Sequence, residues 1–96
     1  MEVIRIHQYT VDPAAVEELI GRRATLIDAI RAAHPGLAET RLIRKHDGTF
    51  VDTWRWDSAA QMQAAFAAIR EFPQAAAAMS LTSDNVAEDG EIIDQR

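Results

Sequence analysis

The sequence predicts an α+β domain with the ferredoxin-like element order β-α-β-β-α-β. Three observations predict it: stretches rich in β-branched and aromatic residues, two stretches with helical periodicity and helix-start signals, and an Asp47-Gly48 turn between the second and third strands. The 96 residues suit one domain and are too few for two. We therefore expect a single domain over residues 1–96 with a four-stranded antiparallel sheet.

The first strand is expected over residues 2–11. Alternation places Val3, Arg5, His7 and Tyr9 on one of its faces and Ile4, Ile6 and Gln8 on the other. A helix is expected from Asp12-Pro13 to about residue 33, because an acidic N-cap and a proline at the first helical position favour a helix start. The turn His34-Pro35-Gly36 ends this helix.

Two more strands are expected over residues 38–46 and 49–56. The second of them carries Phe50, Asp52, Trp54 and Trp56 on one face. Ser58 and Gln61 form a capping box that starts a second helix, and Pro73 must kink this helix or divide it. A last strand is expected over residues 85–94, with an interruption at Asp89-Gly90.

Charge and composition exclude several classes of protein. Ten basic and fifteen acidic side chains give a net charge of −5, whereas nucleic acids and anionic membranes bind basic surfaces. The absence of cysteine excludes disulfides, thiolate metal sites and cysteine nucleophiles. No signal-peptide pattern is visible, and no apolar run approaches the ~18 residues of a membrane span. We expect a cytoplasmic protein that binds neither nucleic acid nor membranes.

Both faces of the predicted sheet carry apolar side chains, but two helices cover only one face. Exposing the other face to water would be unfavourable. We therefore expect a homodimer with twofold symmetry in which two sheets pack face to face.

Three segments resemble the antibiotic-biosynthesis monooxygenase-like family of dimeric α/β barrels: Arg5-Ile6-His7-Gln8-Tyr9, His34-Pro35-Gly36, and Trp56-Asp57-Ser58-Ala59-Ala60-Gln61. The resemblance covers nearly the whole chain. It implies a pocket between sheet and helices in each subunit and a sheet-on-sheet dimer. Some members of this family oxidise polycyclic phenols with molecular oxygen and no cofactor, and others degrade haem.

The haem-degrading branch of the family has an asparagine on the first strand, a tryptophan ending the third strand and an iron-binding histidine on the second helix. Trp56 matches the tryptophan. His7 or Gln8 occupies the asparagine position, and Phe66 lies about where the iron ligand would be. The resemblance therefore implies no haem and no other cofactor for this chain.

His7, Tyr9 and Trp56 are the candidate catalytic residues. The ordinary pKa of histidine, near 6.5, suits a general base, although a half-buried histidine can equally serve structure. Tyr9 can donate a hydrogen bond to a developing oxyanion, or its hydroxyl can face water. The tryptophan can form a pocket wall or fill a small core. A metal site is not predicted, because no two histidines have ligand spacing.

Arg5, Trp54, Met62 and Phe66 are the candidate substrate-binding residues. Trp54 can stack on a flat aromatic molecule or pack in the core, while Met62 and Phe66 supply an apolar wall. Arg5 is expected to pair with Asp52 or to hold an acidic substrate.

The leading functional prediction is a cofactor-independent monooxygenase that acts on a phenolic or polycyclic aromatic molecule. Two alternatives stay open, because one fold carries many functions. One is a non-catalytic dimer that binds a small molecule or acts in stress. The other is a cofactorless isomerase or lyase that uses the same pocket.

Overall fold

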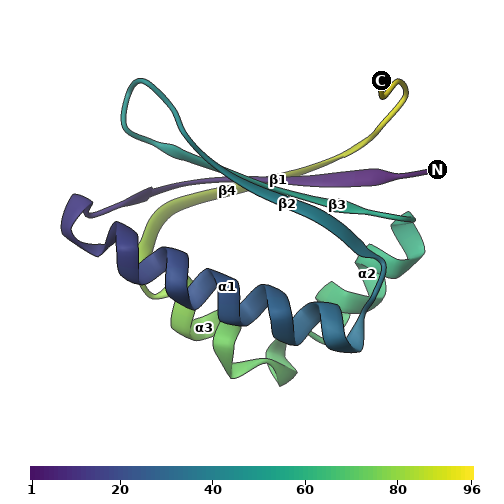
Figure 1. The fold of residues 1–96 in the computed structure, drawn as a ribbon, viewed down its shortest axis with the longest axis horizontal. Helices are drawn as coiled ribbons and strands as arrows, with labels where there is room; N and C mark the ends of the chain where they lie inside the picture. Colours follow the sequence, from purple (N-terminus) through teal and green to yellow (C-terminus); the bar gives the residue numbers. More distant parts are fainter.

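A computed structural model describes residues 1–96 and confirms the predicted ferredoxin-like fold. The four strands are β1 (Val3–Val11), β2 (Leu37–Arg44), β3 (Phe50–Trp56) and β4 (Thr82–Glu91), and the helices are α1 (Val16–Ala33), α2 (Ala59–Ala67) and α3 (Pro73–Met79). The strands form one antiparallel sheet in the order β2-β3-β1-β4. All three helices cover the same face of this sheet (Figure 1).

The helices begin where the sequence predicts. Asp12 accepts a hydrogen bond from the backbone N–H of Ala14 at 2.9 Å, and a short 3-10 turn over Pro13–Ala15 leads into α1. Ser58 caps α2 through the backbone N–H of Gln61. Pro73 divides the second helical stretch: α2 ends in a 3-10 turn over Ile69–Glu71, and the proline begins α3.

The last strand differs from its prediction. It begins at Thr82 and runs to Glu91 without an interruption at Asp89-Gly90. The irregularity lies earlier, because the register with β1 shifts between Gln8 and Thr10. Asp84 sits at this bulge with a φ of 54°, a left-handed conformation that aspartate adopts more readily than most residues.

The core lies between the sheet and the helices. Along β3 every second residue is buried, which confirms the predicted shared face. The larger group of buried residues comprises Val3, Leu26, Ile27, Ile30, Leu37, Trp54, Trp56, Met62, Ala65 and Ala78. A smaller group, Tyr9, Leu19 and Phe50, packs near the other end of the sheet.

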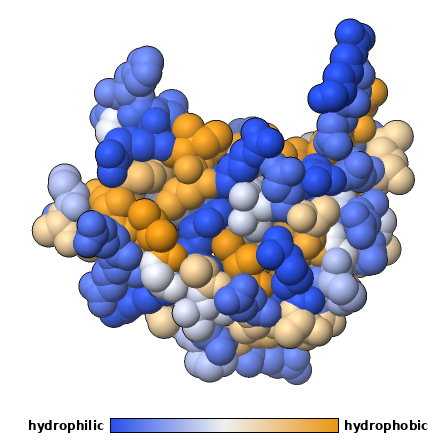
Figure 2. Space-filling model, viewed as in Figure 1, coloured by the Kyte–Doolittle hydropathy of each residue, from blue (hydrophilic) through white to orange (hydrophobic).

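The second face of the sheet has no covering layer. Ile6, Ile43 and Val86 leave 37%, 47% and 59% of their surfaces exposed, and the strand register places all three on this open face. The β2–β3 hairpin and the C-terminal tail rise on either side of it (Figure 1). The space-filling view shows both rising segments as hydrophilic projections with hydrophobic atoms at their bases (Figure 2). No helix is long and apolar enough to cross a membrane.

Candidate active site

A cavity of about 210 Å³ lies between the sheet and the helices, where the two groups of buried residues meet. Strands β1 and β3 form one wall and the helices form the other. The lining residues are Arg5, His7, Tyr9, Leu19, Arg23, Leu26, Asp52, Trp54, Phe66, Ile69, Ala75, Ala78, Met79 and Thr82. Most of this surface is apolar, so the few polar side chains stand out as the groups able to orient a ligand.

Five of the seven predicted site residues line this cavity: Arg5, His7, Tyr9, Trp54 and Phe66. The other two, Trp56 and Met62, lie in the core beside it. Trp56 is fully buried, and its indole N–H has no hydrogen-bond partner. The ring of Trp56 reaches the site only indirectly, through an edge contact with Phe66 at 6.0 Å between ring centroids.

The Asp52 carboxylate is the most heavily hydrogen-bonded group of the cavity wall. It is buried and accepts from the Tyr9 hydroxyl at 2.8 Å and from the Trp54 indole N–H at 2.9 Å. The Arg23 guanidinium reaches it from α1, with Nη2 at 2.9 Å and Nε at 3.0 and 3.1 Å from the two oxygens. These four residues form what we call the Asp52 cluster. The donors compensate a carboxylate that would be very unfavourable in an apolar wall on its own.

The Tyr9 hydroxyl keeps its proton and directs it at Asp52. Burial raises the pKa of Tyr9 well above its usual value, and the Asp52 charge and hydrogen bond raise it further. Its ring stacks on Phe50 at 6.4 Å between centroids. To donate to a substrate oxyanion, as the sequence suggests, the hydroxyl would first have to leave Asp52.

His7 is the group in the cavity that is able to accept a proton. Burial lowers its pKa below the usual 6.5, and the charge of Arg5 lowers it further. The charge of Asp52 and the side chain of Asn85 act in the opposite direction. The imidazole is therefore mostly neutral at pH 7, which is the form that acts as a base. Its ring meets the Tyr9 ring edge-on at 5.5 Å between centroids.

Arg5 does not pair with Asp52, and that prediction is wrong. Its guanidinium binds Asp89, with Nε at 2.8 Å and Nη2 at 3.1 Å from the two oxygens. The reason is the register, since Asp89 on β4 lies directly opposite Arg5, whereas its neighbour on β3 is Trp54. The guanidinium also lies 3.9 Å from the centre of the Phe66 ring, a cation–π contact beside the cavity.

Sequence reasoning missed Arg23 and the full role of Asp52. A signal for both exists. Asp52 stands among aromatic residues on the buried face of β3, and a buried acid needs a cation. Arg23 stands four residues after Leu19 and three before Leu26, on the inner stripe of α1. A cation within such a stripe is the expected partner for an acid on the facing strand.

The arrangement does not fit haem. Helix α2 contains no histidine, and Phe66 lies in the cavity. The cavity is also smaller than the 300–1,000 Å³ of ordinary ligand pockets, and a haem is larger than most ligands. No three histidine, aspartate or glutamate side chains come together in a group able to hold a metal ion.

Comparison with known proteins supports the fold. No family model matches the sequence, and none of the curated proteins matches it. Among solved structures, SnoaB, a cofactor-independent oxygenase from Streptomyces nogalater, superposes with a TM-score of 0.73 at 24% identity over 98% of this chain and 95% of that one.

Two further structures are similar. A mutant of MhuD, with two manganese protoporphyrin IX bound per active site, gives a TM-score of 0.72 at 22% identity over 98% of this chain and 97% of that one. A structure described as an antibiotic biosynthesis monooxygenase gives 0.71 at 16% identity over 96% and 99%. The chain thus has the fold of the antibiotic biosynthesis monooxygenase-like proteins.

Proposed function

We propose that this protein is a cofactor-independent monooxygenase for a small phenolic aromatic substrate. The observation that carries the proposal is the position of His7 on the wall of an otherwise mostly apolar cavity, where burial lowers the pKa of its imidazole. An apolar cavity favours a flat aromatic ring, and a neutral imidazole can remove the phenolic proton. The fold shared with a cofactor-independent oxygenase adds weight to the proposal.

In the proposed reaction His7 takes the phenolic proton, and the electron-rich phenolate reacts with dioxygen at a ring carbon. One oxygen atom becomes the new carbonyl of a quinone. The other leaves as water with two hydrogens from the substrate, one from the hydroxyl and one from the ring carbon. The substrate supplies all the electrons, so the balance needs no external reductant.

The size of the cavity limits the substrate. An apolar cavity of about 150 Å³ accommodates one benzene ring. The present cavity of about 210 Å³ therefore suits one ring with substituents or two fused rings better than a larger polycycle. Trp54 and Phe66, whose ring centroids lie 6.4 Å apart, offer aromatic surface for stacking.

Oxygen uptake with no added cofactor tests the proposal. The panel should contain one-ring phenols, two-ring naphthols and three-ring anthrols, each with hydrogen on the ring carbon para to the hydroxyl. We expect turnover of the smaller members and a loss of about 10²–10⁴-fold in His7→Ala, the usual contribution of a general base. His46→Ala is the matched control, because this exposed histidine at the hairpin tip should leave the rate unchanged.

Three results would contradict the proposal: no uptake with any compound, equal rates for wild type and His7→Ala, or a product that forms equally fast without oxygen. The last result would favour the isomerase or lyase alternative. Thermal stabilisation by a panel compound without any turnover would favour the binding-protein alternative.

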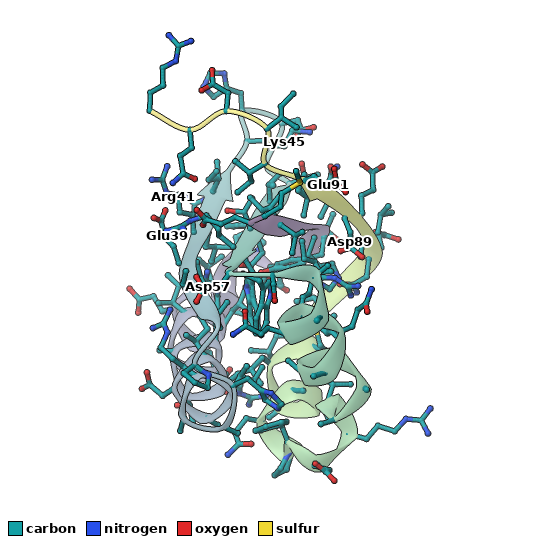
Figure 3. All side chains as sticks on the ribbon, turned by 90° about the vertical axis from the view of Figure 1, so that its right-hand side faces the viewer. Glu39, Arg41, Lys45, Asp57, Asp89 and Glu91 are labelled. Atoms are coloured by element: carbon teal, nitrogen blue, oxygen red, sulfur yellow. The ribbon has the colours of Figure 1, made fainter.

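We also infer that the chain forms a homodimer through the open face of its sheet. Exposed Ile6, Ile43 and Val86 supply apolar surface that a second copy would bury. On the same face, Glu39 accepts hydrogen bonds from both Arg41 and Arg55. Because these charges are paired, few unpaired charges on this face would oppose contact with a second copy of the chain. Figure 3 shows Glu39 and Arg41 together at one edge of the sheet and Asp89 and Glu91 at the other.

A further inference from the structure

The Asp52 carboxylate and the His7 imidazole are cross-strand neighbours on the cavity face of the sheet. His7 on β1 lies directly opposite Asp52 on β3, and both side chains line the cavity. Side chains of directly opposite residues have β-carbons about 4.5–5.5 Å apart, which is close enough for strong charge interaction.

The Tyr9 side chain links the two groups. Its ring contacts the His7 ring edge-on, and its hydroxyl donates to the Asp52 carboxylate at 2.8 Å. This one side chain therefore touches the imidazole and holds the carboxylate. Arg23 and Trp54 hold the same carboxylate from the side of α1 and from β3.

We propose that Asp52 is a positioning residue for His7: held in place by Tyr9, Trp54 and Arg23, it provides the negative charge that stabilises the imidazolium formed when His7 takes the substrate proton. This inference rests on the proposed function, because it assigns a role within the same reaction. It adds a residue that does not touch the reacting atoms and that acts through His7.

The charged and titratable groups around His7 come from several strands and from one helix. Strand β1 contributes Arg5 and Tyr9, β3 contributes Asp52, and α1 contributes Arg23. Strand β4 contributes Asp89, which is bound to Arg5. The cavity residues of α2 and α3 are apolar. Asp52 is thus the one acid that lines the cavity with His7.

The test is a proton NMR titration of the three histidines, with the His7 signal assigned by its absence in His7→Gln. The Asp52→Asn variant removes the charge and keeps the shape of the side chain. We expect the pKa of His7 to fall, since a raising influence is lost. Glu88→Gln is the matched control, because Glu88 lies beside the β4 partner of His7 but on the opposite face. It should leave the His7 pKa unchanged.

Asp52→Asn leaves the largely buried Arg23 side chain, which is 15% exposed, without its partner, and the variant can fail to fold. The double variant Arg23→Met, Asp52→Asn removes the ion pair as a unit and avoids this problem. Because the loss of the Arg23 charge acts on His7 in the opposite direction, the double variant is compared with Arg23→Met alone. A fall of the His7 pKa in Asp52→Asn, or in the double variant relative to Arg23→Met, supports the proposal. An unchanged or raised His7 pKa in the comparison whose variants fold would overturn it.

The dependence of the reaction rate on pH tests the role of Asp52 independently of the titration. With a substrate from the panel, Asp52→Asn should move the acid limb of the rate profile to lower pH and reduce the plateau rate by about tenfold. Loss of rate with no movement of the limb would show a merely structural role and would overturn the proposal. The titration needs no substrate, so failure of the monooxygenase proposal and failure of this one are distinguishable.

Discussion

Burial acts on His7 and Asp52 in opposite ways. The half-buried imidazole loses part of its solvation and holds its proton less tightly. The buried Asp52 accepts hydrogen bonds from Arg23, Tyr9 and Trp54 at both of its oxygens, and these bonds offset the cost of burying a carboxylate. One wall of the cavity therefore brings together an imidazole with a lowered pKa and a carboxylate, the pair that we propose for proton abstraction from a phenol.

The pKa directions of His7 and Tyr9 predict how the proposed reaction should depend on pH. The base acts when neutral, so kcat/KM should rise with pH through the pKa of His7 and then level off. Burial lowers that pKa, so half-maximal activity is expected on the acid side of pH 6.5. The pKa of Tyr9 is raised, so ionisation of Tyr9 should cause no further change of kcat/KM near neutral pH. Rates measured from about pH 5 to about pH 9 check this. A midpoint above pH 7 would contradict the assignment of His7.

The predictions of which side chains lie together depended on the alternation of side chains between the two faces of a strand. Alternation grouped His7 with Tyr9 on one face of β1 and Trp54 with Asp52 on one face of β3, and β1 and β3 pair without a register shift at those positions. It did not predict which face of the sheet the helices cover. It could not separate Trp54, which lines the cavity, from Trp56, which fills the core, since both share that face. That distinction depends on where the helices pack.

The capping signals in the sequence predict where the helices begin. The start of β4 is not predicted from the sequence, because it lies at a backbone bulge. Thr10 bonds to Ser83 and Asp84 across the bulge, at Oγ1–Oγ and Oγ1–Oδ2 distances of 2.6 and 3.2 Å. These contacts join residues more than seventy positions apart, so local sequence does not reveal them. The residues from Thr82 to Asn85 are all polar, a composition typical of a loop, so the sequence does not predict a strand there.

The role of Ser58 as the N-cap of α2 leads to a prediction about stability. Its hydroxyl accepts a hydrogen bond from the N–H of Gln61 and begins α2, the helix that carries Phe66 into the cavity. Ser58→Ala should lower the free energy of unfolding by about 1 kcal/mol, the usual contribution of an N-cap. Urea unfolding measures the change. Ser58→Asp is the control, since aspartate caps equally well, and a similar loss in that variant would argue against capping as the cause.

At the scale of the whole molecule, helices on one side of the sheet leave the other side open. The apolar residues on both strand faces predict an open apolar face, and the strand register places the exposed Ile6, Ile43 and Val86 on it. Sequence alone does not reveal the two projections that flank the open face. Their direction depends on the twist of the hairpin and on the path of the chain after β4.

The homodimer is tested with one charged substitution on each side of the molecule. Ile43→Glu places a charge on the open face, and Ile20→Glu places one on the exposed side of α1, where the isoleucine is 51% exposed. Sedimentation should give twice 10.7 kDa for wild type and Ile20→Glu and the monomer mass for Ile43→Glu. A wild-type mass of 10.7 kDa at micromolar concentration would contradict the inference.

We propose that His7 activates a small phenol for direct reaction with dioxygen. The measurement that tests it is turnover, under isotopically labelled dioxygen, of a one- or two-ring phenol that carries hydrogen on the ring carbon para to its hydroxyl, with wild type and His7→Ala compared and no cofactor added. We expect one labelled oxygen atom in the quinone, the other in water, and a loss of about 10²–10⁴-fold in the rate of the variant. A product without label, or equal rates in the two proteins, would contradict it.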